Sequence, residues 1–151
     1  MISSLPWSEN FNVGHLGLDE EHRGLVELIN DVIAAVHDKT NLEKLPDLLP
    51  TLLKALREAT VEHLRNEDAI LWELRQGKYA RLKGNPRTPQ FVKAMAGAAF
   101  DEHMAEHEKL LSQFDDVSKL PHDKLCETLK SWFLDHAIKH DAHLKAIFQA
   151  L

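Results

Sequence analysis

The sequence predicts an all-α protein, an up-down-up-down four-helix bundle with an irregular N-terminal arm and one long loop. Two observations predict this fold. Four long segments repeat their apolar residues at three- and four-residue steps, which is the period of a helix with one buried face. Most connections between these segments are short, as they are between antiparallel neighbours in a bundle. A length of 151 residues is usual for one domain, so we expect a single domain over residues 1–151.

The first helix is expected to follow an irregular arm over residues 1–18. Asp19 is the predicted N-cap, and Glu20 and Glu21 place negative charge in the first turn, where the helix dipole favours it. The helix should end near residues 39–41. Its apolar face consists of His22, Leu25, Val26, Ile29, Val32, Ile33 and Val36.

The second helix is predicted to begin near Pro46 or Pro50, because proline is tolerated in a first turn, and to end at Gly77. Residues 77–89 then break the pattern with glycines and prolines and carry four basic side chains, so we expect a long surface loop. The second helix's inward face consists of Leu49, Leu52, Leu53, Leu56, Thr60, His63, Glu67, Leu71 and Leu74.

The third helix is expected over residues 90–118 and the fourth over residues 122–150, with Leu120 and Pro121 between them. The inward face of the third is Phe91, Val92, Met95, Ala99, Phe100, His103, His107, Leu110, Leu111, Phe114 and Val117. That of the fourth is Leu125, Leu129, Trp132, Phe133, His136, His140, Leu144, Ile147 and Leu151.

Composition excludes several classes of protein. The formal net charge of −6 argues against a general nucleic-acid surface. No apolar run is long enough to span a membrane, and the N-terminus lacks the pattern of a signal peptide. Cys126 is the one cysteine, so no internal disulfide can form and a reducing compartment is expected. The prediction is a cytoplasmic protein without a membrane or nucleic-acid partner.

Histidine is unusually frequent, with ten in the chain, and several fall on the inward faces. A single buried histidine is most often a core residue bonded to a backbone carbonyl. Five histidines and a glutamate cannot all be buried unpaired. Each unpaired buried polar group costs roughly 1–3 kcal/mol, and a domain is stable by only about 5–15 kcal/mol. A shared metal site would satisfy all of them as ligands. The candidates are His22, His63, Glu67, His103, His107 and His136.

The fourth helix leaves a choice open. His140 lies four residues after His136 and shares its face in an α-helix, whereas Asp141 lies five residues after it and about 140° around the axis. Asp141 reaches the centre only from the flank, or if the helix contains a π-type bulge.

The ordered set resembles the hemerythrin family. The match rests on Asp19-Glu20-Glu21-His22, the His63 and Glu67 pair, the His103 and His107 pair, and the stretch from Trp132 through His136 to Asp141; Trp7 and Val13-Gly14 also resemble bacterial members. The resemblance implies that Asp141, not His140, is the fourth-helix ligand. It further implies two iron ions with a bridging oxo or hydroxo group. His103, His107 and His136 would bind one iron, His22 and His63 the other, and Glu67 and Asp141 would bridge them.

This ligand set leaves one coordination position open, on the iron held by His22 and His63, where O2 can bind. We therefore expect reversible O2 binding, for oxygen storage, delivery or buffering, in a protein that is not an enzyme and has no catalytic residue. A packed apolar pocket including Leu64, Trp132 and Phe133 would limit access of water. The alternatives are an oxygen or redox sensor acting through a protein partner, a di-iron oxidase or peroxidase, and a structural metal site.

The sequence departs from the family pattern in two places. The connection between Glu67 and His103 is long and includes the basic residues 77–89, which are either a structural insertion or a docking surface for a protein partner. Leu144 stands where the resemblance leads us to expect a tyrosine. The remaining histidines, His15, His37, His122 and His143, are expected to face solvent or cap helices.

Overall fold

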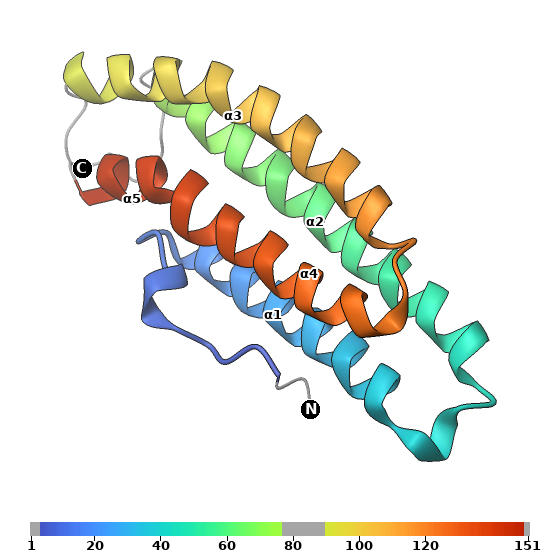
Figure 1. The fold of residues 1–151 in the computed structure, drawn as a ribbon. Coiled ribbons are helices and arrows are strands. Elements are labelled where there is room, and N and C mark those ends of the chain that lie inside the picture. Colours follow the sequence, from blue (N-terminus) through green and yellow to red (C-terminus); the bar gives the residue numbers. More distant parts are fainter. Residues whose placement is uncertain (1–3, 77–89, 150–151) are drawn as a thin grey trace.

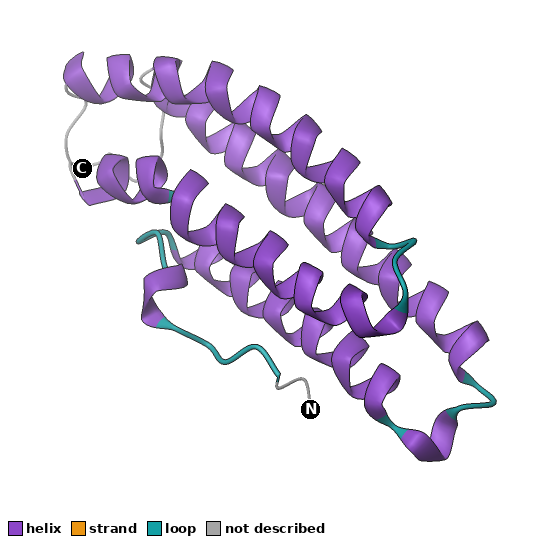
Figure 2. Cartoon of the chain, in the orientation of Figure 1, coloured by secondary structure: helices purple, strands orange, loops and turns teal. Residues whose placement is uncertain are grey.

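The computed structural model describes residues 4–76 and 90–149, with the side chains of all but Asn41, Gln90, Phe91 and His140. Within this part of the chain every regular element is a helix (Figure 2). The elements are listed in chain order: the 3₁₀ turn η1 (Glu9–Phe11), α1 (Leu16–His37), the 3₁₀ turn η2 (Lys39–Asn41), α2 (Leu45–Gln76), α3 (Gln90–Val117), α4 (His122–Leu134), the π-helical segment η4 (Asp135–His140) and α5 (Ala142–Gln149).

The helices form the predicted four-helix bundle (Figure 1). α1 packs against α2 and α4, and α3 packs against α2 and α4. The segments α4, η4 and α5 follow one another as one column, so together they occupy the place of the predicted fourth helix. No helix in residues 4–76 or 90–149 is long and apolar enough to cross a membrane.

α1 begins earlier than the sequence predicts. Its N-cap is His15, whose Nδ1 accepts a hydrogen bond from the amide of Leu18 across 3.2 Å. Asp19, the predicted cap, instead accepts from the amide of Val13 across 2.6 Å. The chain turns there at Gly14, whose φ of 93° suits glycine. Asp19, which local propensity predicts as the N-cap, is therefore bonded to the arm instead, and His15 caps the helix.

The other helix boundaries lie close to those expected. α2 begins at Leu45, just before both candidate prolines, so Pro50 lies inside the helix. α3 ends at Val117, one residue earlier than expected. The predicted stop at Gly77 and the loop over residues 77–89 lie outside the described residues. On α3, Met95 is 36% exposed rather than inward, and Ala96 is fully buried in its place.

The N-terminal arm lies along the bundle (Figure 1). Leu5 is bound at both backbone groups by Asn30 of α1, because its amide donates to Oδ1 across 2.7 Å and its carbonyl accepts from Nδ2 across 2.9 Å. Phe11 packs edge-on against Phe133 of α4, with ring centroids 5.2 Å apart. The arm thus covers the side of the bundle where α1 meets α4.

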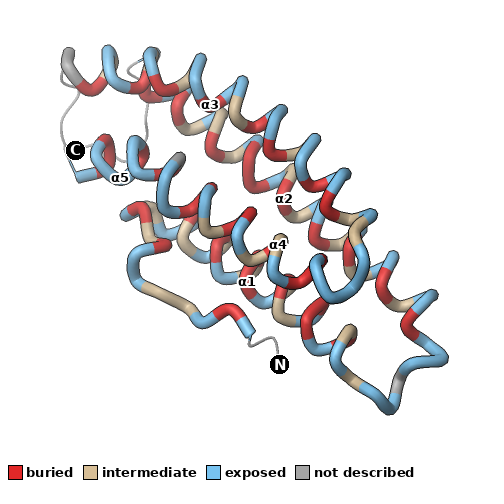
Figure 3. Tube along the Cα trace, in the orientation of Figure 1, coloured by how far each residue is buried: buried red, intermediate tan, exposed pale blue. Residues whose placement is uncertain are grey.

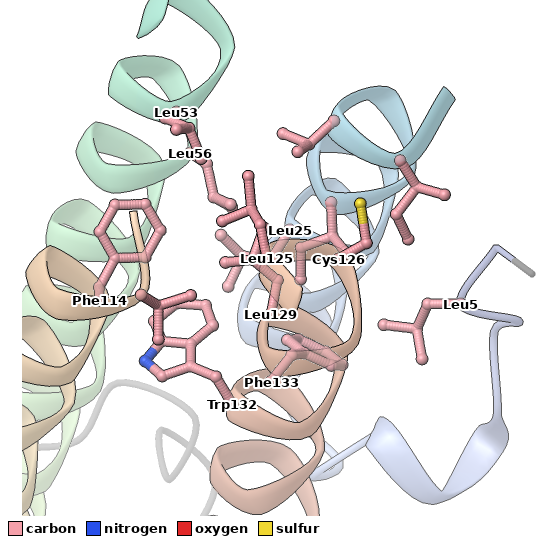
Figure 4. Close-up of a cluster of buried hydrophobic side chains, with 14 of the residues drawn as sticks. Leu5, Leu25, Leu53, Leu56, Phe114, Leu125, Cys126, Leu129, Trp132 and Phe133 are labelled. Carbon is pink, nitrogen blue, oxygen red and sulfur yellow. The ribbon is translucent and has the colours of Figure 1, made fainter. Parts of the chain in front are cut away.

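Buried positions follow the inner faces of the helices (Figure 3), and the apolar ones form two separate clusters. The larger cluster includes Leu25, Leu56, Phe114, Leu129 and Phe133 (Figure 4). The smaller consists of Val13, Leu18, Leu71, Leu74, Val92, Ala96, Ala99, Leu144, Ile147 and Phe148. Each of the four helical columns contributes residues to both clusters. In every column, buried polar residues lie between the two apolar stretches.

Candidate metal centre

A layer of buried polar side chains separates the two apolar clusters. It contains all seven residues singled out as ligands, and none is more than 5% exposed. They come from α1, α2, α3 and the η4 column, so the layer spans the bundle. They are His22, His63, Glu67, His103, His107, His136 and Asp141. Thr60 is also buried, but its hydroxyl is satisfied within α2 by the carbonyl of Leu56 at 2.7 Å.

Glu67 lies at the middle of the layer, with its two oxygens facing different histidines. Oε1 is 2.8 Å from Nε2 of His63 and 3.4 Å from Nε2 of His136. Oε2 is 3.0 Å from Nε2 of His107 and 3.9 Å from Nδ1 of His103. A carboxylate with one oxygen toward each side has the arrangement that a bridging ligand needs.

Asp141 enters the layer because the fourth helical column contains the π segment. Its Oδ2 lies 2.9 Å from Nε2 of His22 and 3.2 Å from Nε2 of His136. Residues five apart share a face in a π-helix, so His136 and Asp141 both point inward. The side chain of His140, the geometric alternative, is outside the described part.

Several atoms of this layer are close together and yet unpaired. Nε2 of His22, Oε1 of Glu67 and both oxygens of Asp141 are buried without a hydrogen-bond partner. The same holds for Nε2 of His103, Nδ1 of His107 and Oδ1 of Asp68. Nε2 of His22 and Oδ2 of Asp141 are only 2.9 Å apart and yet are recorded without a hydrogen bond. Lone pairs that converge on a shared third atom have this geometry, whereas buried polar groups that serve only structure are normally paired. The donor set therefore fits a metal centre.

The potential ligand atoms fall into two groups, each within a span of 4.8 Å. One consists of His22, His63, Glu67, His136 and Asp141, and the other of Glu67, His103 and His107. Glu67 belongs to both. The Nε2 atoms of His63 and His136 are only 3.4 Å apart, although the resemblance assigns these two histidines to different ions. Which three histidines share an ion thus stays a prediction.

An outer layer orients the histidines. Nδ1 of His22 donates to the carbonyl of Phe11 across 2.6 Å, and Nδ1 of His63 donates to Oε1 of Glu21 across 2.8 Å. The hydrogen bonds of His22 and His63 fix the tautomer of each ring and leave its other nitrogen free for a metal. Nδ1 of His107 lies 3.0 Å from Oδ1 of Asp68, but the two atoms form no hydrogen bond. His103 differs, since its nitrogen nearest to Glu67 is Nδ1.

Sequence reasoning missed these outer residues. Glu21 and Asp68 were visible as acidic neighbours of His22 and Glu67 in the chain. Glu21 is hydrogen-bonded to His63, and Asp68 lies beside His107; each histidine belongs to another helix. Their position next to a candidate ligand in the sequence could have identified Glu21 and Asp68. It could not have shown which histidine each of them contacts.

The electrostatics favour the charged forms of His22, His107 and Glu67, whereas burial lowers the pKa of His103. Burial lowers the pKa of His22, but Asp141 and Glu67 outweigh burial and raise it to about 9. Burial likewise lowers the pKa of His107, while Asp68 and Glu67 raise it to about 9. Burial raises the pKa of Glu67, yet the charges of His63 and His136 hold that pKa well below its usual range. Protons thus neutralise the carboxylates when metal does not, and metal must displace them.

The histidines outside the layer behave as expected where they are described. His15 caps α1, and His37, His122 and His143 are exposed. Leu144, at the position where a tyrosine was expected, is fully buried in the smaller apolar cluster. Asp141 therefore has an apolar neighbour one turn along the helix.

These features define a class of protein, the four-helix bundles that bind metal through histidines and carboxylates projecting inward from every helix. The model of the hemerythrin HHE cation-binding domain matches residues 16–148, and the chain belongs to this family. It is also similar to a hemerythrin-like protein of Nematostella vectensis, with 27% identity over 140 residues that cover 92% of this chain and 72% of the relative. No solved structure matches the chain.

Proposed function

We propose that the protein binds O2 reversibly at a centre of two iron ions joined by an oxo or hydroxo bridge, and that it serves oxygen storage, delivery or buffering and not catalysis. The observation that supports this most is the convergence of unpaired ligand atoms from His22, Glu67 and Asp141. Five imidazoles and two carboxylates suit iron, for which imidazole is a good ligand and carboxylate an acceptable one.

The number of ligands supports binding of a small molecule. If both ions are six-coordinate, and if Glu67, Asp141 and one oxygen from water bridge them, the seven protein ligands leave a single position open. Iron bound there would supply the electrons that hold O2, and the protein's part would be to keep the ligands oriented and the surroundings dry.

The surroundings favour release of unchanged O2 over its reduction. Phe133 is 1% exposed and Leu64 3%, and the ring of Phe133 lies 5.9 Å from that of His22, centroid to centroid. Trp132 is buried as well and donates to the carbonyl of Leu110 across 3.1 Å, which fixes its ring. An apolar shell of this kind limits entry of water and reductants. The ligand set also has fewer carboxylates than the ferritin-type sites, which use four glutamates.

An absorption spectrum of reduced, iron-loaded protein cycled between air and argon tests the proposal. We expect a visible charge-transfer band that appears in air and disappears under argon over repeated cycles, with zinc-loaded protein as the blank. Iron-loaded protein that never develops the band would overturn the proposal. Rapid irreversible oxidation with repeated turnover of hydrogen peroxide would indicate an oxidase or peroxidase instead.

A further inference from the structure

His63 depends on two side chains from different helices for its orientation. Its Nδ1 donates to Oε1 of Glu21, which comes from α1, across 2.8 Å. The other oxygen of Glu21 accepts from Nδ2 of Asn66, on α2, across 2.6 Å. His63 and Asn66 are three residues apart on α2, so Glu21 closes a ring of contacts between the two helices. A carboxylate can only accept, which means that Asn66 presents its amide nitrogen and His63 its Nδ1 proton.

Glu21 has room to move away from His63. It lines a hollow of about 210 Å³ between α1 and α2, together with Gly24, Ala59, Glu62 and three other residues. A side chain added at Gly24 would meet nothing within 4 Å, which shows how open this side of the hollow is. The side chain of Glu21 is 30% exposed, whereas that of His63 is 1% exposed. An exposed glutamate gains rotamer freedom and hydration if it swings into such a space.

We propose that Asn66, which is not one of the candidate ligands, is a positioning residue of the metal centre: it holds Glu21 against His63 and thereby fixes the tautomer and the direction of that imidazole. The orientation of His22 does not depend on Asn66, because Nδ1 of His22 donates to the main-chain carbonyl of Phe11 across 2.6 Å. Asn66 therefore acts on one side of the centre. This inference rests on the metal centre of the proposed function but not on O2 binding.

The consequence is an uneven effect on the two ions. Loss of an outer partner typically lowers metal affinity by about 10- to 100-fold. Asn66→Leu keeps a similar volume and removes the donor, so Glu21 is freed but present. We expect one of the two ions to be released at a chelator concentration about 10-fold lower than in the wild type. The ion held without His63 should be released as before.

The test uses full-length, zinc-loaded protein, labelled with ¹⁵N at histidine. Nuclear magnetic resonance gives the tautomer of His63 and the exchange rate of its Nδ1 proton with water, and chelator titration gives the release of each ion. Asn66→Leu and Glu21→Gln should both speed the proton exchange and release one ion early. In Glu21→Gln, the oxygen of the amide can still accept from His63, but the charge is lost. Glu62→Gln, at an exposed position lining the same hollow, is the matched control and should behave as the wild type.

Two results would overturn the assignment: unchanged exchange and release in Asn66→Leu, or equal weakening of both ions, which would indicate a general loss of structure. Circular dichroism of each variant checks the fold. Because neither readout involves iron or O2, failure here is distinguishable from failure of the proposed function.

Discussion

The amide of Asp141 donates a hydrogen bond to the carbonyl of His136 across 3.1 Å, five residues back along the chain. In an α-helix the bond would run to Ala137, and Asp141 would lie about 140° away from His136 around the axis. The π segment over Asp135–His140 holds one residue more than a regular helix needs there. It brings the imidazole and the carboxylate to one face, 3.2 Å apart at their nearest atoms.

A deletion tests whether the extra residue is only a spacer. Removing Ile138, which is 49% exposed, leaves His136 and Asp141 four apart, a separation of about 40° in an α-helix. The core residues of α5 keep their faces. We expect this variant to fold and to retain metal, as measured by helicity and metal content. The control is a deletion at the exposed Ser131, within the regular α4, which should rotate all later residues by about 100°. We expect this control to lose both its helicity and its metal. Metal loss in the Ile138 variant despite normal helicity would show that the π geometry itself is required.

The inner face of each helix was predictable, since the apolar period fixes it and the candidate ligands share it. Asp141 was not predictable from periodicity, because nothing in Asp135–His140 marks a bulge: the segment has no glycine or proline. The family resemblance supplied that residue, and the structure places it within 2.9 Å of His22.

The predictions that depended on local propensity or on one helix alone were less accurate. Asp19 is the better N-cap by residue type, yet the arm's Val13 amide occupies it and His15 caps the helix. The pairing of Glu21 with Asn66 depends on the rotation and stagger of α1 against α2. No single-helix pattern encodes those quantities.

Removal of one imidazole should cost metal. His103 is 2% exposed, and its Nδ1 lies 3.4 Å from Nε2 of His107 and 3.9 Å from Oε2 of Glu67. We expect His103→Ala to lose at least one metal equivalent, measured by elemental analysis of purified protein. His143→Ala, on the exposed side of α5, should keep the wild-type content. Full occupancy of both ions in His103→Ala would contradict the ligand assignment.

The arm should detach locally when its anchor is removed. Asn30→Ala deletes both bonds to Leu5, each worth roughly 1 kcal/mol net. We expect a loss of about 1–2 kcal/mol in the free energy of unfolding and faster hydrogen exchange at the Leu5 amide. Phe11 and its contact with Phe133 should hold the rest of the arm, so metal content should not change. Asp31→Ala, at the next, exposed position, controls for the loss of a polar helix residue. A drop in metal content with Asn30→Ala would mean that metal binding depends on the bonds between Asn30 and the arm.

The metal-free protein should lose stability as the pH rises above neutral. The folded pKa values of His22 and His107, about 9, lie above the ordinary value of 6.5, so the folded state binds protons more tightly than the unfolded state. Their contribution is fully present below about pH 6.5 and is lost as the pH rises through about 9. Each shift corresponds to a change on the order of 3 kcal/mol. Glu67 and Asp141 have lowered pKa values, so their contribution is lost only when the pH falls through those values.

Bound metal should remove this trend, because it takes the place of the protons on these nitrogens. Metal ligands must be deprotonated, so raising the pH from about 6.5 to 9 favours the loaded state. Chemical denaturation at constant ionic strength should give a stability that falls over that range without zinc and does not fall with zinc bound. The two curves should approach each other in mild acid, where protons compete with metal. Parallel curves would mean that the protons of His22 and His107 and the metal do not share the same atoms, and the assignment of these residues as ligands would have to be abandoned.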